Sequence, residues 1–537
     1  MLSYRKLAMR VLGHPLHTGG IDSPRPASQR AAAFILTAAM LTTLAAPAFA
    51  DIWHIENGDI TISAGESGNN VTQNNNTTYG DTNTIITNQN KDKASSHTVT
   101  IETNDKNDKV EVTLKDVNID TSSRNKAAVS VTGSGNTTIK LDGDNALKSD
   151  TYRSGIYGSG SGSLTISGGE NDSLTAQGGS GANGISSSGS LTISGGTVTA
   201  NGDDGGRGIS SSGSVTISGG STVTANGGSG TISGGDGICS SGGITISGGS
   251  TVTANGGNGG SLVGGDGIRS GGGLTVSDGT VTAKGGNGDS KDGYGGDGIR
   301  SGGGVTISGN TVNAAGGYGG KVGGYGICSF DRVAISGGTV EAAGGNGSTG
   351  GGSGIYSSVI DLSGSLELTA KAGSPNGKAL SQKGSELVLD TIKDKLGPGA
   401  KVTATDADGK VIDQVSTPRP VEPEESSSSS DGGSAAPSAP ASPLPGLTVT
   451  DKDGQRISYT STQSGNTLTV CVGRFTASFR ISLAALRQLR AEGIETITFQ
   501  TILCSTTLSV DELLAMGGED AEAVLTHRFT DSSLTVG

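Results

Sequence analysis

Hydrophobic and polar residues alternate in short groups along most of the chain, and glycines separate the groups. The unit that begins at Gly184 shows the pattern well, with alternating pieces at 185–187, 191–194 and 197–200. Each piece has the period of two that is typical of a β-strand, and a turn signal follows each one. The pattern therefore predicts three short strands per unit and no helix.

The unit recurs along the chain. An isoleucine that follows a glycine marks each copy, at intervals of 24–31 residues, and these anchor isoleucines are Ile156, Ile185, Ile209, Ile238, Ile268, Ile299, Ile327 and Ile355. A repeat of this length is typical of a solenoid. We predict an all-β fold, a right-handed parallel β-helix with three short strands per coil. The handedness follows from the usual chirality of crossover connections.

Alternation also predicts which side chains face the interior. The anchor isoleucine points inward, as do the aliphatic residues of each L-T-I-S and T-V-T-A segment. Stacking then places Ile238, Ile268 and Ile299 in one column. The serine two positions after the anchor also points inward, and we expect these serines to form a ladder that satisfies its own hydrogen bonds. The Gly-Gly pair after T-I-S predicts a corner with positive φ.

The first 50 residues have the features of an export signal. Residues 31–44 form an uncharged apolar run, basic residues precede it, and Ala48-Phe49-Ala50 matches a cleavage site. We expect a secretory signal peptide over 1–50, so that the mature chain is secreted or extracellular and could be associated with a cell surface. A retained anchor or a mitochondrial-type presequence is the alternative. We expect no membrane span in the mature chain.

The rest of the chain divides by composition. Residues 51–416 continue the alternation, with regular repeats at about 150–370, and we assign them to the β-helix. Residues 417–446 are rich in Pro and Ser, which predicts a linker. Residues 447–537 lose glycine and gain helix signals, including helix-capping serines at Ser482 and Ser509. They predict a small α+β domain of unknown role.

Composition and charge limit the classes of molecule that this chain is expected to bind. Gly accounts for 95 of 537 residues, but without the G-X-Y period of collagen. The formal net charge is −13, and it becomes −17 when the five basic residues and one aspartate of residues 1–50 are removed. An acidic chain of this kind argues against nucleic acid as the partner. We expect a monomer.

The Gly-rich runs between T-V-T-A and the next anchor vary most in length, and such insertions collect on one edge of a solenoid. Near them, Arg269 and Arg300 follow their anchors and should be neighbours on successive coils. Two stacked guanidinium groups favour an anionic ligand such as a uronate. Tyr294, Tyr318 and Tyr325 lie in the variable runs and could reach the same ligand. In the simpler interpretation, the arginines form ion pairs with Asp266 and Asp297, and the tyrosines are isolated surface residues that bind no ligand.

Three units read G-G-D-G-I, which places Asp236, Asp266 and Asp297 at matching positions. Stacking would bring these carboxylates to about 5 Å, where like charges repel. A bound Ca²⁺ would relieve the repulsion. The simpler interpretation is turn chemistry, because Asp-Gly suits tight turns.

The cysteines and histidines give weaker signals. Cys239 and Cys328 lie three coils apart, beyond disulfide reach, and we expect them to be free. Cys471 and Cys504 could pair. After residue 50 the only histidines are His54, His97 and His527, which form no motif for a Ser-His-Asp hydrolase or a zinc site.

The motifs V-T-L-K-D-V-N-I at Val112–Ile119, A-A-V-S-V at Ala127–Val131 and T-I-K-L at Thr138–Leu141 precede the repeated G-I-x-S-x-G-x-L-T-I-S-G-G-T-V-T-A. Over about residues 99–370 the chain resembles a bacterial family of extracellular carbohydrate-binding domains. The resemblance implies a right-handed parallel β-helix, related in shape to polysaccharide lyases. It also implies binding of plant cell-wall polysaccharide, with calcium ions on the helix.

These observations lead to one leading hypothesis and two alternatives. We expect a non-catalytic protein that binds plant cell-wall or acidic polysaccharide along the flank of the helix, through many weak contacts. The first alternative is a Ca²⁺-dependent polysaccharide lyase on the same scaffold, for which Arg269 or Arg300 is the visible basic catalyst. The second is a surface adhesin or spacer, whose C-terminal domain does the binding.

Overall fold

The structure is a computed structural model that describes residues 51–418 and most of 446–537. The gaps in the second range are 452–455, 458, 465, 473–476, 502–504, 517, 519–520, 528–531 and 537. The chain divides into two compact units, Met1–Glu422 and Pro423–Gly537. The expected signal peptide and nearly all of the expected linker lie outside the described residues.

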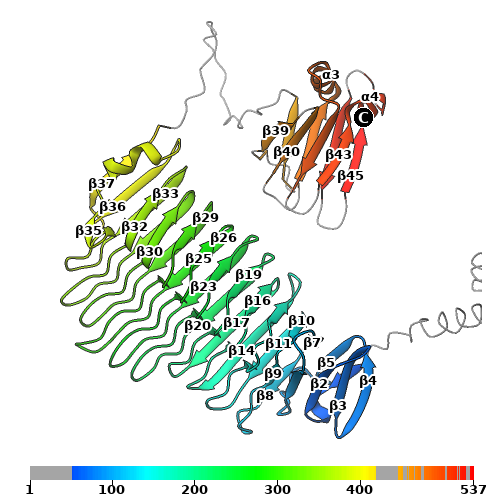
Figure 1. Cartoon of the computed structure of the whole chain (residues 1–537), viewed down its shortest axis with the longest axis vertical. Coiled ribbons are helices and arrows are strands. Elements are labelled where there is room, and N and C mark those ends of the chain that lie inside the picture. The colour runs from blue at the N-terminus through cyan, green and yellow to red at the C-terminus, as the bar shows by residue number, and fades with distance from the viewer. Residues whose placement is uncertain are drawn as a thin grey trace, which may run out of the picture. The chain divides into compact units, whose positions relative to one another are not determined.

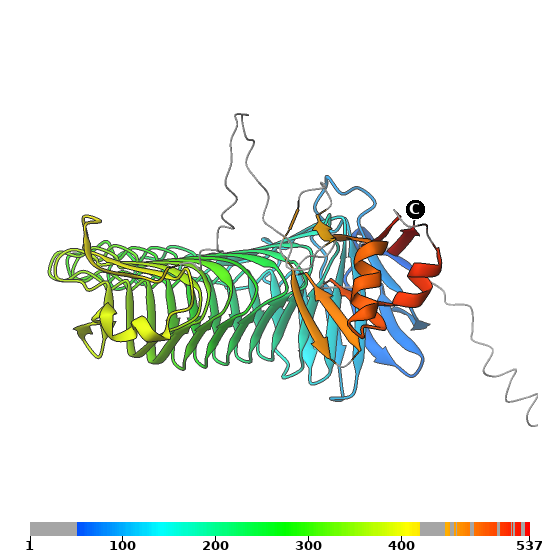
Figure 2. The ribbon, with the colours of Figure 1, turned by 90° about the horizontal axis from the view of Figure 1, so that it is seen from above.

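The first unit is a solenoid of about 13 parallel coils (Figures 1 and 2). A regular coil consists of β15 (Ile185–Ser187), β16 (Leu191–Ser194) and β17 (Thr197–Asp203). Each strand pairs in parallel with its equivalent on the next coil, so that Ile185 lies opposite Ile209 and Leu191 opposite Val215. The predicted coil of three short strands is confirmed.

Three parallel ladders run along the solenoid, one for each strand position. The first contains β15 together with β2 (Ile60–Gly65), β6 (Val99–Thr103), β9 (Val129–Gly133), β12 (Ile156–Gly158), β18 (Ile209–Ser211), β21 (Ile238–Ser240), β24 (Ile268–Ser270), β27 (Ile299–Ser301), β30 (Ile327–Ile335), β32 (Ile355–Leu362) and β34 (Leu380–Gln382). The second contains β16 together with β1 (Ile52–His54), β5 (Thr84–Thr87), β7 (Lys109–Lys115), β10 (Asn136–Asp142), β13 (Leu164–Ser167), β19 (Val215–Ser218), β22 (Ile244–Ile246), β25 (Leu274–Val276), β28 (Val305–Ile307) and the second halves of β30 and β32. The third contains β17 together with β8 (Asn118–Asp120), β11 (Asp144–Lys148), β14 (Ser173–Ser180), β20 (Thr222–Asn226), β23 (Ser250–Asn255), β26 (Gly279–Lys284), β29 (Asn310–Ala315), β31 (Gly338–Ala343), β33 (Leu366–Lys371) and β36 (Lys401–Thr405).

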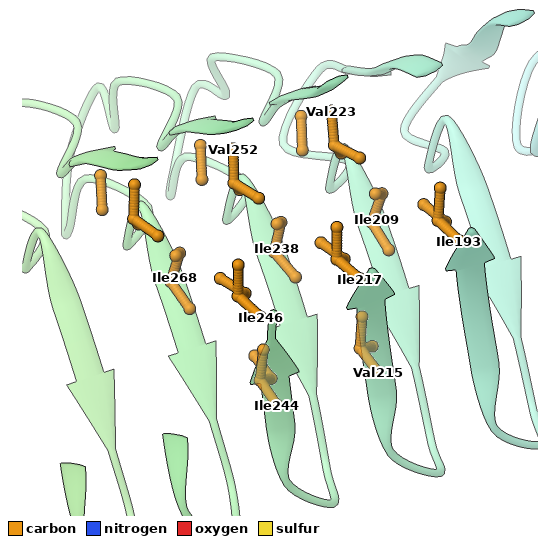
Figure 3. Packing of buried hydrophobic residues seen from close by; sticks show 14 of the residues in the cluster. Ile193, Ile209, Val215, Ile217, Val223, Ile238, Ile244, Ile246, Val252 and Ile268 are labelled. Atoms are coloured by element: carbon orange, nitrogen blue, oxygen red, sulfur yellow. The ribbon is translucent and has the colours of Figure 1, made fainter. Parts of the chain in front are cut away.

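Aliphatic columns fill the interior between the ladders. Ile238 lies opposite Ile268, and Ile268 lies opposite Ile299, in unbroken register. All three side chains are fully buried. Figure 3 shows Ile209, Ile238 and Ile268 at the same place on successive coils. Each buried aliphatic side chain contributes roughly 1.5–3 kcal/mol, so the columns supply the main stabilisation of the solenoid.

The inward serines are buried as predicted, but the predicted partner is wrong. Ser240 donates to the carbonyl of Gly213 at 2.8 Å, and Ser301 donates to that of Gly272 at 2.8 Å. These two hydroxyls therefore bond a backbone carbonyl at the turn of the preceding coil rather than the next serine, whereas Ser187 bonds Gly189 of its own coil. The strand is only three residues long, so turn carbonyls lie closer to the hydroxyl than the stacked serine does. The predicted glycine corner is confirmed, since Gly219 and Gly220 have φ of 68° and 71°.

Antiparallel strands cover both ends of the solenoid. At the start, β3 (Gly68–Gln73) and β4 (Asn76–Asp81) add to β2, and η1 (Ile55–Asn57) follows β1. At the end, β35 (Ser385–Glu386) pairs with β34, and β37 (Val411–Ser416) pairs with β36. The 3₁₀ helix η2 (Leu389–Lys395) follows β35, and its first residue, Leu389, is fully buried. Such pairing occupies ladder edges that another chain could otherwise extend.

The Gly-rich runs form an ordered layer, which we call the glycine fin: residues 227–235, 256–265, 285–296, 316–324 and 344–352. The runs lie one above another along one edge of the coils (Figure 1). Parallel bridges join Gly259 to Gly288 and Gly288 to Gly319. The outgoing and returning arms alternate in one hydrogen-bond relay, in which Gly286 donates to Gly265 and Gly296 to Gly286, both at 2.8 Å. The runs vary in length, yet they stack in register.

Close backbone approach explains the glycine content of the fin. A Cβ on Gly286 would lie 2.0 Å from the carbonyl oxygen of Gly257. No backbone shift within one coil relieves such a clash, because the coils on both sides are equally close.

The second unit has two four-stranded sheets around a separate core. The sheets are β38 (Leu447–Thr450), β41 (Ala477–Ser482), β44 (Glu522–His527) and β45 (Ser532–Val536), and β39 (Thr460–Ser464), β40 (Thr467–Cys471), β42 (Thr496–Gln500) and β43 (Ser505–Ser509). The rings of Phe479 and Phe499, one from each sheet, lie 4.8 Å apart. Ser482 caps α3 (Leu483–Ala491), and the Ser509 hydroxyl accepts the N–H of Glu512 in the first turn of α4 (Val510–Met516), as predicted.

We predict that Gly286→Ala destabilises the solenoid by about 2 kcal/mol or more, because overpacking against backbone forces the coils apart. Gly350→Ala is the matched control in the same fin. A Cβ there would meet only Val322 side-chain atoms at 3.8 Å. Thermal unfolding of both variants measures the difference, and equal midpoints would contradict close packing of the fin.

Candidate functional site

A groove lies where the returning arm of the glycine fin meets the first ladder. Its cavity has a volume of about 440 Å³. Glycine backbone from successive coils lines much of the cavity, so that side chains do not fill it. The other lining residues are Asn183, Arg207, Ser233, Asp236, Val263, Asp266, Arg269 and Arg300. Because these residues come from successive coils, the groove follows the solenoid axis.

Arginine side chains form a row along the groove. Arg269 and Arg300 lie opposite each other in the first ladder, as the sequence predicted. Their side chains are 51 % and 38 % exposed. Arg207 joins them on the wall of the same groove, although it occupies a different position in its coil. The three guanidinium groups are the cationic groups that line this groove, and the carboxyl groups of Asp236 and Asp266 line it too.

The three predicted aspartates form a column beneath the arginines. Asp236, Asp266 and Asp297 are each 4–6 % exposed. The Oδ1 of Asp236 accepts the backbone N–H of Asp266 at 2.9 Å, and the Oδ1 of Asp266 accepts that of Asp297 at 2.8 Å. Asn183 has the same role on an earlier coil, since its Oδ1 accepts the N–H of Arg207 at 2.8 Å. The column thus links each coil to the next.

The other carboxylate oxygen of each aspartate faces an arginine. Asp236 Oδ2 lies 3.0 Å from Arg207 Nε, Asp297 Oδ2 lies 3.3 Å from an Arg300 nitrogen, and Asp266 Oδ2 lies 3.8 Å from an Arg269 nitrogen. The simpler interpretation of the sequence, pairing of the arginines with Asp266 and Asp297, is therefore confirmed. Arg269 has the longest contact and the greatest exposure.

Burial changes the protonation of Asp266 and Asp297. Burial, and then the charges of Asp297 and Asp236, raise the pKa of Asp266 to about 8. Burial also raises the pKa of Asp297, to about 6, although the N–H of Tyr325 and the charge of Arg300 oppose the shift. A neutral Asp266 holds Arg269 less tightly than a carboxylate would.

The aspartate column fits a calcium site poorly. Ca²⁺ needs six to eight oxygens around one point. Among the described residues, no three His, Cys, Asp or Glu side chains converge on a position that could hold a metal ion. Backbone N–H groups and arginines already use the carboxylate oxygens. Calcium binding by Asp236, Asp266 and Asp297 stays a prediction.

The three predicted tyrosines have different neighbours. Tyr294 bridges to Val263 and Val322 in the returning arm of the fin, and Lys321 Nζ lies 5.6 Å from its ring. The backbone N–H of Tyr318 donates to Asn287. Tyr325 follows Asp297 in the aspartate column and donates its backbone N–H to Asp297 Oδ1 at 2.7 Å. None of the three is among the residues that line the cavity.

Sequence reasoning missed Arg207, Phe330 and the partner of Tyr325. Arg207 stands two residues before its anchor, at the offset of the three aspartates, so a comparison by offset would have found it. Tyr356 stacks on Tyr325, with 5.0 Å between ring centroids. Phe330 lies beneath the Arg300 guanidinium at 5.3 Å. No sequence pattern marks Phe330, because it stands in the part of β30 where the register with the next coil shifts and the repeat is irregular.

In the described regions of the chain, the cysteines are free thiols, and His97 and His527 lie in different units. Cys239 and Cys328 are free, as expected, and burial raises their thiol pKa values to about 11 and about 12. His97 binds Asp59 at 3.2 Å in the first coils, whereas His527 is buried in the second unit. Cys471 is also a free thiol, and its suggested partner Cys504 lies outside the described residues.

Comparison with protein-family models, with curated proteins and with solved structures finds no match. The solenoid fold thus stands on the structure itself, while the resemblance to a carbohydrate-binding family stays a prediction. In the described regions of the chain, no helix is long and apolar enough to cross a membrane.

We predict that Asp266→Asn flattens the pH dependence of stability. In the wild type, the unfolded state loses its Asp266 proton near pH 4, but the folded state keeps it up to about pH 8. The free energy of unfolding therefore falls as pH rises through this window, by up to about 1.4 kcal/mol per pH unit. Asn keeps a side-chain oxygen that accepts the backbone N–H of Asp297, and it cannot ionise. The variant should therefore be more stable than the wild type at pH 9.

Urea unfolding from pH 4 to pH 9 measures this effect. Asp289→Asn, at an exposed position in the fin, is the control. A slope that stays unchanged in Asp266→Asn would show that Asp266 ionises normally in the folded protein.

Proposed function

We propose that the solenoid binds an acidic polysaccharide in the groove beside the glycine fin and does not cleave it. The observation that supports this proposal is the row of half-exposed arginines along one wall of a groove that follows the axis. A polysaccharide is an extended chain, so it can lie along the axis and meet equivalent groups on successive coils. Many weak contacts then add up to useful affinity.

The arginines have N–H donors that their contacts with the aspartates do not use. A guanidinium carries five N–H donors, and each aspartate contact uses one or two of them. The remaining donors of Arg269 and Arg300 can grip a carboxylate in the bidentate geometry that arginine favours. Arg269 is the main contact in this proposal, because its own aspartate lies 3.8 Å away and its side chain is 51 % exposed.

The wall and floor of the groove suit a sugar chain. Glycine backbone at Gly234, Gly235, Gly264 and Gly265 leaves room for a chain to approach closely. Val263, on the outer side, is 38 % exposed and offers an apolar surface to the face of a sugar ring. In this proposal the chain is exported after cleavage near Asp51 and acts outside the cell as a monomer.

We predict that Arg269→Ala weakens binding of polygalacturonate about 5- to 20-fold, and Arg300→Ala less, because Asp297 already engages Arg300. The chain from Asp51 to Gly537 is retained on an affinity gel that contains the polymer. Raising the salt concentration should weaken wild-type retention and have less effect on Arg269→Ala. Binding that does not depend on either arginine would contradict the proposed site.

The same samples test calcium and catalysis. If the groove binds the polymer without a metal ion, a chelator leaves retention of the protein on the gel unchanged. If the chelator abolishes retention, Ca²⁺ is assigned to the aspartate column. If the protein only binds, the polymer gives no unsaturated product with added Ca²⁺. Product that disappears in Arg269→Ala or Arg300→Ala would establish the lyase alternative instead.

A further inference from the structure

Aromatic rings follow the arginine row at the end of the groove that lies toward the C-terminus of the solenoid. In the first ladder, Arg300 lies opposite Cys328, and Cys328 lies opposite Tyr356. Successive coils are about 4.8 Å apart, so Tyr356 stands about two coils beyond Arg300. The column thus changes from cationic to aromatic along one face of the molecule.

Tyr325 and Tyr356 form a stacked pair. Their ring centroids are 5.0 Å apart, and the angle between the ring planes is 21°. The backbone N–H of Tyr325 is fixed to Asp297 Oδ1 at 2.7 Å, which ties the pair to the aspartate column. Both residues are half-buried, so each is held in place and still reaches the surface.

Phe330 lies on the other side of the arginine column. It stands three residues after its anchor Ile327, whereas Tyr325 stands two residues before it. Its side chain is 55 % exposed. The Arg300 guanidinium lies 5.3 Å from the centroid of the Phe330 ring. The backbone carbonyl of Phe330 accepts a hydrogen bond from the Ser358 hydroxyl at 2.7 Å. One isolated exposed ring would need no explanation. Here one ring lies against Arg300, and the stacked pair begins at Tyr325, whose backbone N–H is bonded to Asp297.

These rings differ from the arginines in the chemistry that they offer. An aromatic face attracts the C–H face of a pyranose ring through dispersion and burial of apolar surface, and neither depends on salt. The arginines attract carboxylates, and salt weakens that attraction. A chain that lies along the groove would meet the two kinds of contact one after the other.

We propose that Phe330 and the Tyr325–Tyr356 pair form a ring-stacking subsite, which takes an uncharged sugar face of the chain whose carboxylates lie on the arginines. This inference rests on the proposed function, and it adds residues and a ligand chemistry that the arginine row does not supply. Rings beside arginines also suit single-stranded nucleic acid. The formal charge of −13 favours a sugar chain that carries carboxylates on only some of its units, because a nucleic acid brings a phosphate on every unit.

The test compares two forms of one polymer, polygalacturonate and its methyl ester, which lacks the charge. The chain from Asp51 to Gly537 is titrated with each polymer at low salt and at about 0.5 M NaCl, where charges are screened beyond a few ångströms. We expect Phe330→Ala and Tyr356→Ala to weaken binding about 5- to 10-fold for both forms and at both salt concentrations. Arg269→Ala should weaken only the binding of the charged form at low salt.

Tyr157→Ala is the matched control. Tyr157 occupies the same column as Tyr356, seven coils earlier, and is 42 % exposed, but no ring stacks on it in the described structure. Its replacement should leave both affinities unchanged. Tyr356→Phe keeps the ring and should restore binding. Phe330 is the more exposed of the two tested rings, so Phe330→Ala tests the subsite even if Tyr356→Ala lowers the thermal midpoint.

The outcomes separate the two proposals. If both alanine variants bind like the wild type, or no worse than Tyr157→Ala, the ring-stacking subsite is wrong. If they lose affinity while Arg269→Ala does not, the subsite stands and the arginine site fails. If the wild type binds neither form of the polymer, or binds single-stranded oligo-dT more tightly than both, the subsite is overturned as a sugar site.

Discussion

Parallel backbone pairing between equivalent residues of successive coils is the interaction on which this structure depends. Parallel strands hold each residue directly beside its equivalent, because their hydrogen bonds are evenly spaced. Residues at the same position of the repeat therefore form a column along the axis. Ile238 over Ile268 and Arg269 over Arg300 follow from the same register. The same parallel register therefore arranges the side chains of the core and those of the candidate site.

The same rule has a cost wherever a column carries charge. Asp236, Asp266 and Asp297 stack because their positions in the repeat match, and burial makes their mutual repulsion stronger. The structure offsets this cost with two kinds of partner. Backbone N–H groups of the next coil bond one oxygen, and arginines approach the other. The pKa values of Asp266 and Asp297 stay raised, chiefly because both groups are buried, so the compensation is partial.

Glycine has a second use in the fin. At corners it supplies positive φ, but in the fin it permits arms of neighbouring coils to touch backbone to backbone. Gly286 and Gly296 continue one relay of hydrogen bonds through both arms. The result is a thin ordered layer without side chains on its closely packed positions. A groove with a backbone floor follows, and only the residues at its walls, such as Arg269 and Val263, determine what it can bind.

The sequence by itself determined the coil, the inward columns and the pairing of Arg269 with Arg300, because these depend only on alternation and on the length of the repeat. It also placed the three aspartates in one column. Tertiary structure decided how the glycine runs fold, since their hydrogen bonds join residues of different coils and leave no local pattern. It decided that the serines bond turn carbonyls, because that contact depends on how a turn is oriented. It also decided that Phe330 lies under Arg300, because Phe330 stands where the register of β30 with the next coil shifts. Repetition can be read from a sequence, whereas the orientation of a turn is set by what packs around it.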